Sequence, residues 1–175
     1  MKNNAILFIF HKFIFFWLSV ACLFVATGCA TTQIRDGIFS PSHGNYAIHV
    51  PNDRWEPIRL HKEDITLWNK QYNASIAIIS TDRENKKSSL ELFANRLFIG
   101  MQNKRIVARE PVLINDYQAI RTILTGEIDN FTLKIDSFII KTDKKVYDLV
   151  YWVSPEFFHY LHDDFLNMIK TFKLM

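Results

Sequence analysis

Two kinds of hydrophobic pattern run along residues 46–173. Runs rich in β-branched and aromatic residues, in which apolar and polar positions often alternate, predict strands. The predicted strands cover residues 46–50, 64–68, 75–79, 111–115, 117–128, 131–142 and 145–153. Apolar residues spaced three and four apart predict two helices, over residues 90–101 and from Pro155 into the C-terminal segment. Strands, a helix, more strands and a final helix predict an α+β fold, a mostly antiparallel β-sheet flanked by two α-helices.

Local signals place the ends of these elements. Ser88 and Glu91 have the spacing of a capping box, so the first helix is predicted to begin with the Ser88 hydroxyl as its cap. Hairpin turns are predicted at residues 128–131 and 142–145. In the last helix one stripe is predicted to be buried against the sheet. Its members are Phe158, Leu161, Phe165, Met168, Ile169 and Phe172.

Residues 1–28 have the pattern of a bacterial lipoprotein signal peptide. Residues 13–26 form an apolar run that follows Lys2 and Lys12. The run fits the signal-peptide core of about 7–15 residues better than a membrane span of about 20. Ala26 and Gly28 are the small residues expected before a cleavage site, which predicts a cut between Gly28 and Cys29 and a lipid on Cys29. An uncleaved N-terminal anchor and a secreted protein with a chance cysteine are the alternatives.

The predicted mature chain has a tether and one globular domain. Residues 29–45 are polar and rich in turn residues, so they are predicted to form a flexible tether, and residues 46–175 form the domain. Cys22 would be removed with the signal peptide, which leaves Cys29 without a partner for an internal disulfide. Ala30, rather than Asp, follows Cys29. In a Gram-negative host with the usual sorting rule, that residue predicts the outer membrane, facing the periplasm.

The charge of the mature chain is nearly balanced. Two of the 21 Lys and Arg residues precede Cys29, which leaves 19 against 18 Asp and Glu. Paired lysines such as Lys86 and Lys87 occur, but no basic stripe with interleaved aromatic residues does. Such a stripe is what a nucleic-acid surface requires, so no nucleic-acid partner is expected. The membrane, through the lipid on Cys29, and an envelope protein are the expected partners.

The order of motifs resembles the PsbP-like superfamily, which includes Ran-binding Mog proteins, PsbP proteins of photosystem II and DcrB-type lipoproteins. Residues 46–51 read YAIHVP and precede Trp55, similar to the opening of that family. Residues 145–152 (KVYDLVYW) resemble its penultimate strand, and residues 164–172 (DFLNMIKTF) resemble its closing helix. The resemblance implies an α/β/α sandwich. It also implies, by analogy, an accessory or binding protein without catalytic activity or a cofactor.

Few residues have the spacing that catalysis requires. His159, His162 and Asp163 share one flank of the last predicted helix at metal-ligand spacing, although a zinc site needs a further ligand or water. The competing interpretation is a polar helix flank. Glu63 and Asp64 are adjacent on a strand and therefore point to opposite faces. Ser88 and Ser89 lack the glycines of a nucleophile elbow.

Three functions fit these observations. The first is a lipid-anchored cell-envelope binding or accessory protein without catalysis. The second is a small-molecule or lipid-binding lipoprotein that serves an envelope transporter, which would need a large apolar pocket. The third is a metal-dependent hydrolase that uses His159, His162 and Asp163, which would need another ligand from elsewhere in the fold.

Overall fold

A computed structural model describes residues 34–43, 45–51, 53–58, 63–83 and 88–175 of the chain. The predicted signal peptide, its cleavage site and Cys29 lie outside these residues. In the part that is described, no helix combines the length and apolarity needed to cross a membrane.

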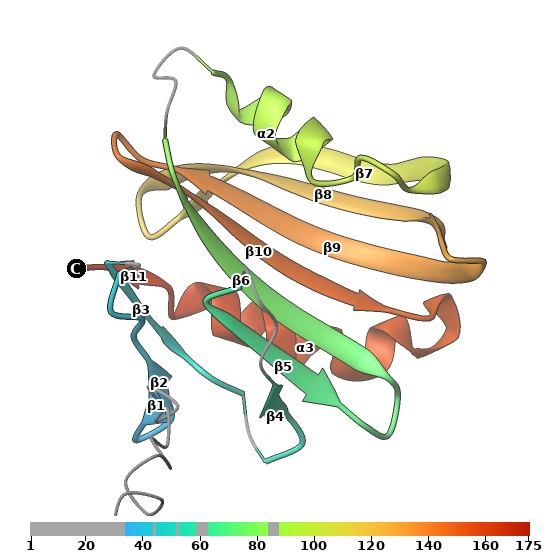
Figure 1. Cartoon of the computed structure of the whole chain (residues 1–175), viewed down its shortest axis with the longest axis horizontal. Helices are drawn as coiled ribbons and strands as arrows, with labels where there is room; N and C mark the ends of the chain where they lie inside the picture. Colours follow the sequence, from blue (N-terminus) through green and yellow to red (C-terminus); the bar gives the residue numbers. More distant parts are fainter. Residues whose placement is uncertain (1–33, 44, 52, 59–62, 84–87) are drawn as a thin grey trace, which may run out of the picture. The chain divides into compact units, whose positions relative to one another are not determined.

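A seven-stranded antiparallel sheet forms the centre of the described domain (Figure 1). Its order is β4-β5-β6-β10-β9-β8-β7. The strands are β4 (Glu56–Ile58), β5 (Ile65–Asn69), β6 (Ala74–Asp82), β7 (Gln102–Ile114), β8 (Tyr117–Ile128), β9 (Phe131–Lys141) and β10 (Lys145–Val153). β10 pairs with β6 on one side and with β9 on the other. The predicted hairpins β8–β9 and β9–β10 are therefore confirmed, with the turns at the predicted places.

Two α-helices cover opposite faces of this sheet. α2 (Leu90–Arg96) lies over β8 and β9, and α3 (Phe158–Lys170) lies against β10 after the short 3-10 helix η1 (Pro155–Phe157) (Figure 1). Alternation along β10 divides its side chains between the two layers. Tyr147 and Tyr151 join the core under α3, whereas Val146 packs with residues of α2. The predicted mostly antiparallel sheet with two flanking helices is confirmed.

The buried stripe of α3 is as predicted. Phe158, Leu161, Phe165, Met168 and Ile169 are buried, and so is Phe172 just after the helix. Phe165 is fully buried, with its ring between those of Phe138 and Tyr151 at centroid distances of 5.8 and 5.7 Å. A large apolar cluster between α3 and the sheet therefore fills the main core.

A second, small sheet differs from the sequence-based prediction. β1 (Ile34–Arg35) and β2 (Ile38–Phe39) form a hairpin that pairs with β3 (Tyr46–His49), and β11 (Lys173–Leu174) pairs with β3 on its other side. Residues 34–39 were predicted to belong to the tether. Asp36 and Gly37 both have positive φ, as a two-residue hairpin turn requires, and the strands are too short to show a periodic pattern.

Residues 88–114 also depart from the prediction. Ser89, not Ser88, is the helix cap, since its hydroxyl accepts a hydrogen bond from the Leu92 amide at 3.2 Å. α2 ends at Arg96 rather than near Met101, and β7 begins at Gln102 rather than at Pro111. β7 is an exposed edge strand, so its first half lacks the apolar alternation by which strands are recognised.

Candidate functional site

A buried cluster of charged groups lies between the sheet and α3. Asp136 of β9 is fully buried, and Arg121 of β8 binds its carboxylate with two nitrogens. Arg121 Nη2 lies 2.8 Å from Asp136 Oδ2, and Arg121 Nε lies 3.1 Å from Oδ1. Ile123 stands opposite Asp136 and Phe138 opposite Arg121, so the two charged residues are diagonal neighbours on one face.

α3 supplies the third member of this cluster. His162 Nε2 lies 2.7 Å from Asp136 Oδ2, and the imidazole ring lies against the Phe158 ring at 4.4 Å between centroids. Only 15% of the His162 side chain is exposed. The interpretation of this helix flank as merely polar is therefore wrong for His162. His159 and Asp163 are exposed and fit it.

The same geometry separates the three candidate metal ligands. His162 contacts Asp136 of the sheet, whereas His159 and Asp163 are exposed side chains. Among the described residues, no group of three His, Cys, Asp or Glu side chains is placed to hold a metal ion. The fold does not bring a further ligand to the predicted trio within that part of the chain.

The charges of the buried cluster are satisfied internally. Hydrogen bonds to Asp136 raise the pKa of Arg121 above its usual value, because they stabilise the charged guanidinium. Glu110 of β7 adds a further carboxylate 3.7 Å from Arg121. Both oxygens of Asp136 lie within hydrogen-bond distance of its partners, and the side chain is fully buried. The cluster joins α3 to β8 and β9.

Asp64, one of the two adjacent carboxylates before β5, lies beside a buried tyrosine. Asp64 lies near the buried hydroxyl of Tyr46, a residue of β3. Burial, and then the negative charge of Asp64, raise the pKa of Tyr46, which therefore stays protonated.

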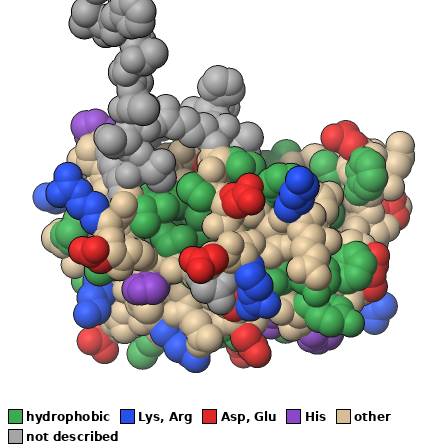
Figure 2. Space-filling model, turned by 90° about the horizontal axis from the view of Figure 1, so that it is seen from below, with side chains coloured by type: hydrophobic (Ala, Val, Ile, Leu, Met, Phe, Trp, Pro, Cys, Tyr) green, Lys and Arg blue, Asp and Glu red, His purple; other side chains and the backbone are tan. Residues whose placement is uncertain are grey.

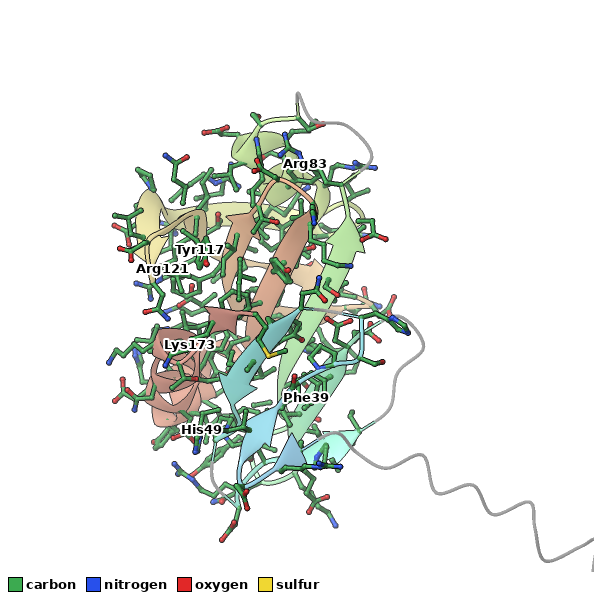
Figure 3. The ribbon with its side chains drawn as sticks, turned by 90° about the vertical axis from the view of Figure 1, so that its left-hand side faces the viewer. Phe39, His49, Arg83, Tyr117, Arg121 and Lys173 are labelled. Carbon is green, nitrogen blue, oxygen red and sulfur yellow. The ribbon has the colours of Figure 1, made fainter. Side chains whose placement is uncertain are left out.

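An open groove lies on the outer side of α3. It has a volume of about 490 Å³ and is bounded by α3, the end of β3 and the β1–β2 turn. The volume falls within the range of small-molecule sites, about 300–1,000 Å³. The lining residues are Gly37, His49, Val50, Pro51, Asp53, Asp164, Asn167, Met168 and Thr171. Figure 3 shows His49 on the small sheet beside α3.

Hydrogen bonds fix the walls of this groove. Asp164 accepts hydrogen bonds from Arg54 Nη2 at 3.0 Å and from Trp55 Nε1 at 3.0 Å. The His49 amide donates to the Thr171 hydroxyl at 2.9 Å, which ties β3 to the end of α3. These contacts hold the polar wall in one geometry, as a binding site requires.

The close approach of Gly37 to His49 depends on glycine. A Cβ added to Gly37 would lie 3.2 Å from His49 Nε2, and the φ of Gly37 is +74°. A side chain at this position would both strain the turn and press on the imidazole. Gly37 therefore leaves room for His49 on the wall of the groove.

The sequence patterns did not single out Asp136, at the centre of the charged cluster, or Asp164, on the wall of the groove. Asp136 is in phase with Phe138 and Ile140 along β9, and a carboxylate in phase with core positions is a signal of a buried charge. Asp164 gave no such signal, because Arg54 and Trp55 reach it from a segment more than a hundred residues away.

Comparisons with known proteins agree on the fold. No protein-family model matches the sequence, and no curated protein matches it either. The solution structure of cyanobacterial PsbP (CyanoP) from Synechocystis sp. PCC 6803 matches with a TM-score of 0.61 at 9% identity, over 86% of this chain and 97% of that one. LpqN, involved in cell envelope biogenesis of Mycobacterium tuberculosis, also matches with a TM-score of 0.61 at 9% identity, over 76% and 86%.

A third solved structure is similar as well. PA94 of Pseudomonas aeruginosa, a protein of unknown function, matches with a TM-score of 0.53 at 11% identity, over 77% of this chain and 93% of that one. The resemblance inferred from the motifs is thereby confirmed at the level of structure, and the chain has the PsbP-like fold.

Proposed function

We propose that this chain is a lipid-anchored binding and accessory protein of the cell envelope, without catalytic activity of its own. The observation that carries the proposal is the contrast between its two polar sites. The charged cluster around Asp136 is closed by its own partners, whereas the groove beside α3 is open and has fixed polar walls. Such a fold is suited to binding rather than to proton transfer.

The anchor rests on the sequence around Cys29. Metabolic labelling with radioactive palmitate should label the wild-type protein and the Cys22→Ala variant, but not the Cys29→Ala variant. Cys22 is the matched control, because it is the other cysteine of the chain. A chain that starts at Thr31 should leave the membrane fraction. Labelling of Cys29→Ala, or membrane retention of the shortened chain, would contradict a lipid anchor.

Ala30, the residue after Cys29, indicates which membrane of the envelope holds the protein. We propose that, in a Gram-negative host with the usual sorting rule, the protein lies in the outer membrane and faces the periplasm, because the residue after Cys29 is Ala and not Asp. LpqN, which has the same fold, is involved in cell envelope biogenesis. Separation of membranes on a sucrose gradient tests the location. Recovery only with inner-membrane markers would disprove it.

The groove has both polar and apolar walls. His49, Asp53, Asp164 and Asn167 line it together with the apolar side chains of Val50, Pro51 and Met168. A lipid or an acyl chain would need a mostly apolar cavity, whereas the described apolar side chains under α3 pack against one another as the main core. A small-molecule binding protein that serves a transporter is therefore the second candidate function, with a small molecule that carries both polar and apolar groups as its ligand.

Native mass spectrometry of the full chain purified from membranes tests the groove. The wild-type protein should carry a small molecule that the Asn167→Trp variant lacks, because the indole would fill the groove. His159→Trp, on the same helix but outside the groove, should keep it. Absence of the molecule from the wild-type protein, or equal occupancy in both variants, would contradict this site.

A further inference from the structure

We propose that a short chain connection holds the β1–β2 hairpin against the lipid bilayer, so that the groove beside the hairpin opens at the membrane surface. The partner of this surface is the bilayer that carries the lipid of Cys29. The inference rests on the lipid anchor proposed above and extends it, because it determines which side of the folded domain faces the membrane.

Little chain separates the predicted lipid from the fold. β1 begins at Ile34, so only residues 30–33 lie between that strand and Cys29. The five peptide steps from Cys29 to Ile34 reach about 18 Å at most, even when the chain is fully extended. A compact domain of about 140 residues has a radius of gyration of about 14 Å, so its diameter exceeds this reach. With Cys29 held at the bilayer by its acyl chains, the side of the domain opposite Ile34 therefore cannot face the membrane.

Ile34 is a fixed point of the domain rather than part of a flexible segment. The β1–β2 hairpin pairs with β3, and the Val50 amide donates a hydrogen bond to the Gly37 carbonyl oxygen at 2.7 Å. Phe39 is 4% exposed, with its ring 6.1 Å from that of Tyr46, and Ile34 packs against the main core. The hairpin therefore adds no flexible length to the connection.

The outer surface of the hairpin is apolar and polar without a net charge. Ile38 is 45% exposed, and Arg35, its partner across the hairpin, is exposed as well. Arg35 and Asp36 carry opposite charges, so residues 34–39 have no net charge. Figure 2 shows the lower side of the domain as drawn in Figure 1, where hydrophobic side chains lie among charged side chains of both signs. The contact thus needs no anionic lipid, because the short connection brings Ile38 to the interface and burial of its side chain there is favourable.

A second exposed isoleucine lies far from the hairpin. Ile99, between α2 and β7, is 76% exposed. Figures 1 and 3 both show α2 and the β1–β2 hairpin at opposite ends of the domain. The large sheet separates them, because Phe39 of the hairpin joins the core under α3, whereas α2 packs on the other face. Apolar exposure alone would assign membrane contact to Ile99, whereas the short connection assigns it to Ile38.

The groove belongs to the same end of the domain as the hairpin. Gly37 of the β1–β2 turn lines it together with His49 of β3. A ligand with both polar and apolar groups, which these walls favour, gathers at the interface between water and lipid, where both kinds of surroundings are available. The groove therefore receives its ligand from the membrane surface.

Site-directed fluorescence quenching tests this orientation. The protein is the processed, lipidated chain, purified from membranes and placed in phosphatidylcholine vesicles in which some headgroups carry a nitroxide quencher. Processing removes Cys22 and lipidates Cys29, so the cysteine of an Ile38→Cys variant is the thiol that takes the dye. This dye should lose most of its fluorescence, and so should a dye at Asn167→Cys in the groove. The matched control, Ile99→Cys, should keep its fluorescence, although Ile99 is the more exposed isoleucine.

A longer connection tests the cause of the contact. Insertion of about 20 Gly and Ser residues between Gln33 and Ile34 gives a flexible coil with a root-mean-square length of about 25–30 Å, counted from Cys29. The domain should then leave the surface, and the dye at Ile38→Cys should regain its fluorescence. Undiminished quenching would overturn the short connection as the cause. Arg35→Cys offers a second dye position on the hairpin if Ile38→Cys does not fold.

Flotation of the vesicles separates this proposal from the anchor on which it rests. If the wild-type protein does not float with the vesicles, the lipid anchor is wrong and the orientation falls with it. If the protein floats but dyes at Ile38→Cys and Ile99→Cys are quenched equally, the anchor stands and the orientation is overturned. Quenching at Ile38→Cys without quenching at Asn167→Cys would overturn the position of the groove at the membrane surface.

Discussion

Single charged residues inside the sheet have well-defined roles in stability. Arg121→Ala should lower the free energy of unfolding by about 3–5 kcal/mol, because it removes the guanidinium that pairs with the buried Asp136 carboxylate and leaves only the contact with His162. Urea denaturation measures this loss. Arg105→Ala is the matched control, since Arg105 is exposed on β7, and it should change the free energy by less than about 0.5 kcal/mol. Equal midpoints for the two variants would show that the Asp136 cluster does not stabilise the fold.

Asp148 of β10 should make stability depend on pH. Burial raises its pKa to about 6 from 3.8, and its Oδ1 accepts no hydrogen bond from the described residues. The folded protein therefore holds a proton that the unfolded chain releases at lower pH. Stability should fall by about 3 kcal/mol as pH rises from about 4 to about 6, and stay at the lower level above that range.

Replacement of this one carboxyl group isolates its effect. Asp148→Asn should flatten the stability profile between pH 4 and pH 6 and raise the urea midpoint at neutral pH. Asp143→Asn, in the exposed β9–β10 turn, should leave the profile as it is in the wild-type protein. A wild-type stability that rises through this pH range, with no change in Asp148→Asn, would mean that other groups control the dependence.

At the scale of elements, Ser89 and Ser88 at the start of α2 should differ in their effect on the free energy of unfolding, because only Ser89 caps the helix. Ser89→Ala should cost about 1 kcal/mol of unfolding free energy, because the Leu92 amide loses its hydrogen-bond acceptor. Ser88→Ala should change it by less than about 0.5 kcal/mol. Ser88 contributes its backbone carbonyl to Lys141, and the substitution leaves that group in place. A larger loss for Ser88→Ala would mean that the capping box predicted from the sequence is formed.

The edge strand β7 is protected against pairing with other chains. Its ladder with β8 has irregularities between Gln102 and Arg105 and between Ile106 and Ala108. Pro111 removes one amide from the strand. Bulges, proline and cationic side chains are the features by which exposed edges avoid aggregation.

At the scale of the whole molecule, the start of the folded domain can be tested directly. A chain that begins at Ile34 should be more stable than one that begins at Tyr46 by about 2–3 kcal/mol. The longer chain keeps Phe39, which is only 4% exposed and lies 6.1 Å from the Tyr46 ring, and burial of such a side chain contributes about 1.5–3 kcal/mol. Thermal and urea unfolding of both chains measure the difference. Equal stability of the two chains would mean that residues 34–45 do not stabilise the domain and belong to the tether, as the sequence predicts.

The sequence by itself determined the elements whose signals are local. The helix α3, its buried stripe and the hairpins β8–β9 and β9–β10 follow from periodicity and turn residues, because each pattern lies within one continuous segment. The same patterns were enough to indicate the PsbP-like fold. The lipoprotein signal around Cys29 is likewise local and stays a prediction.

Only the tertiary structure decided which side chains meet. Three contacts join residues that are far apart in the chain. His162 contacts Asp136, and Tyr72 stacks on Tyr160. Arg54 and Trp55 donate hydrogen bonds to Asp164. Their partners depend on strand order and helix placement, which periodicity within a segment does not encode. The β1–β2 hairpin belongs to the same class, because strands of two residues gain stability only by pairing with β3 and burying Phe39.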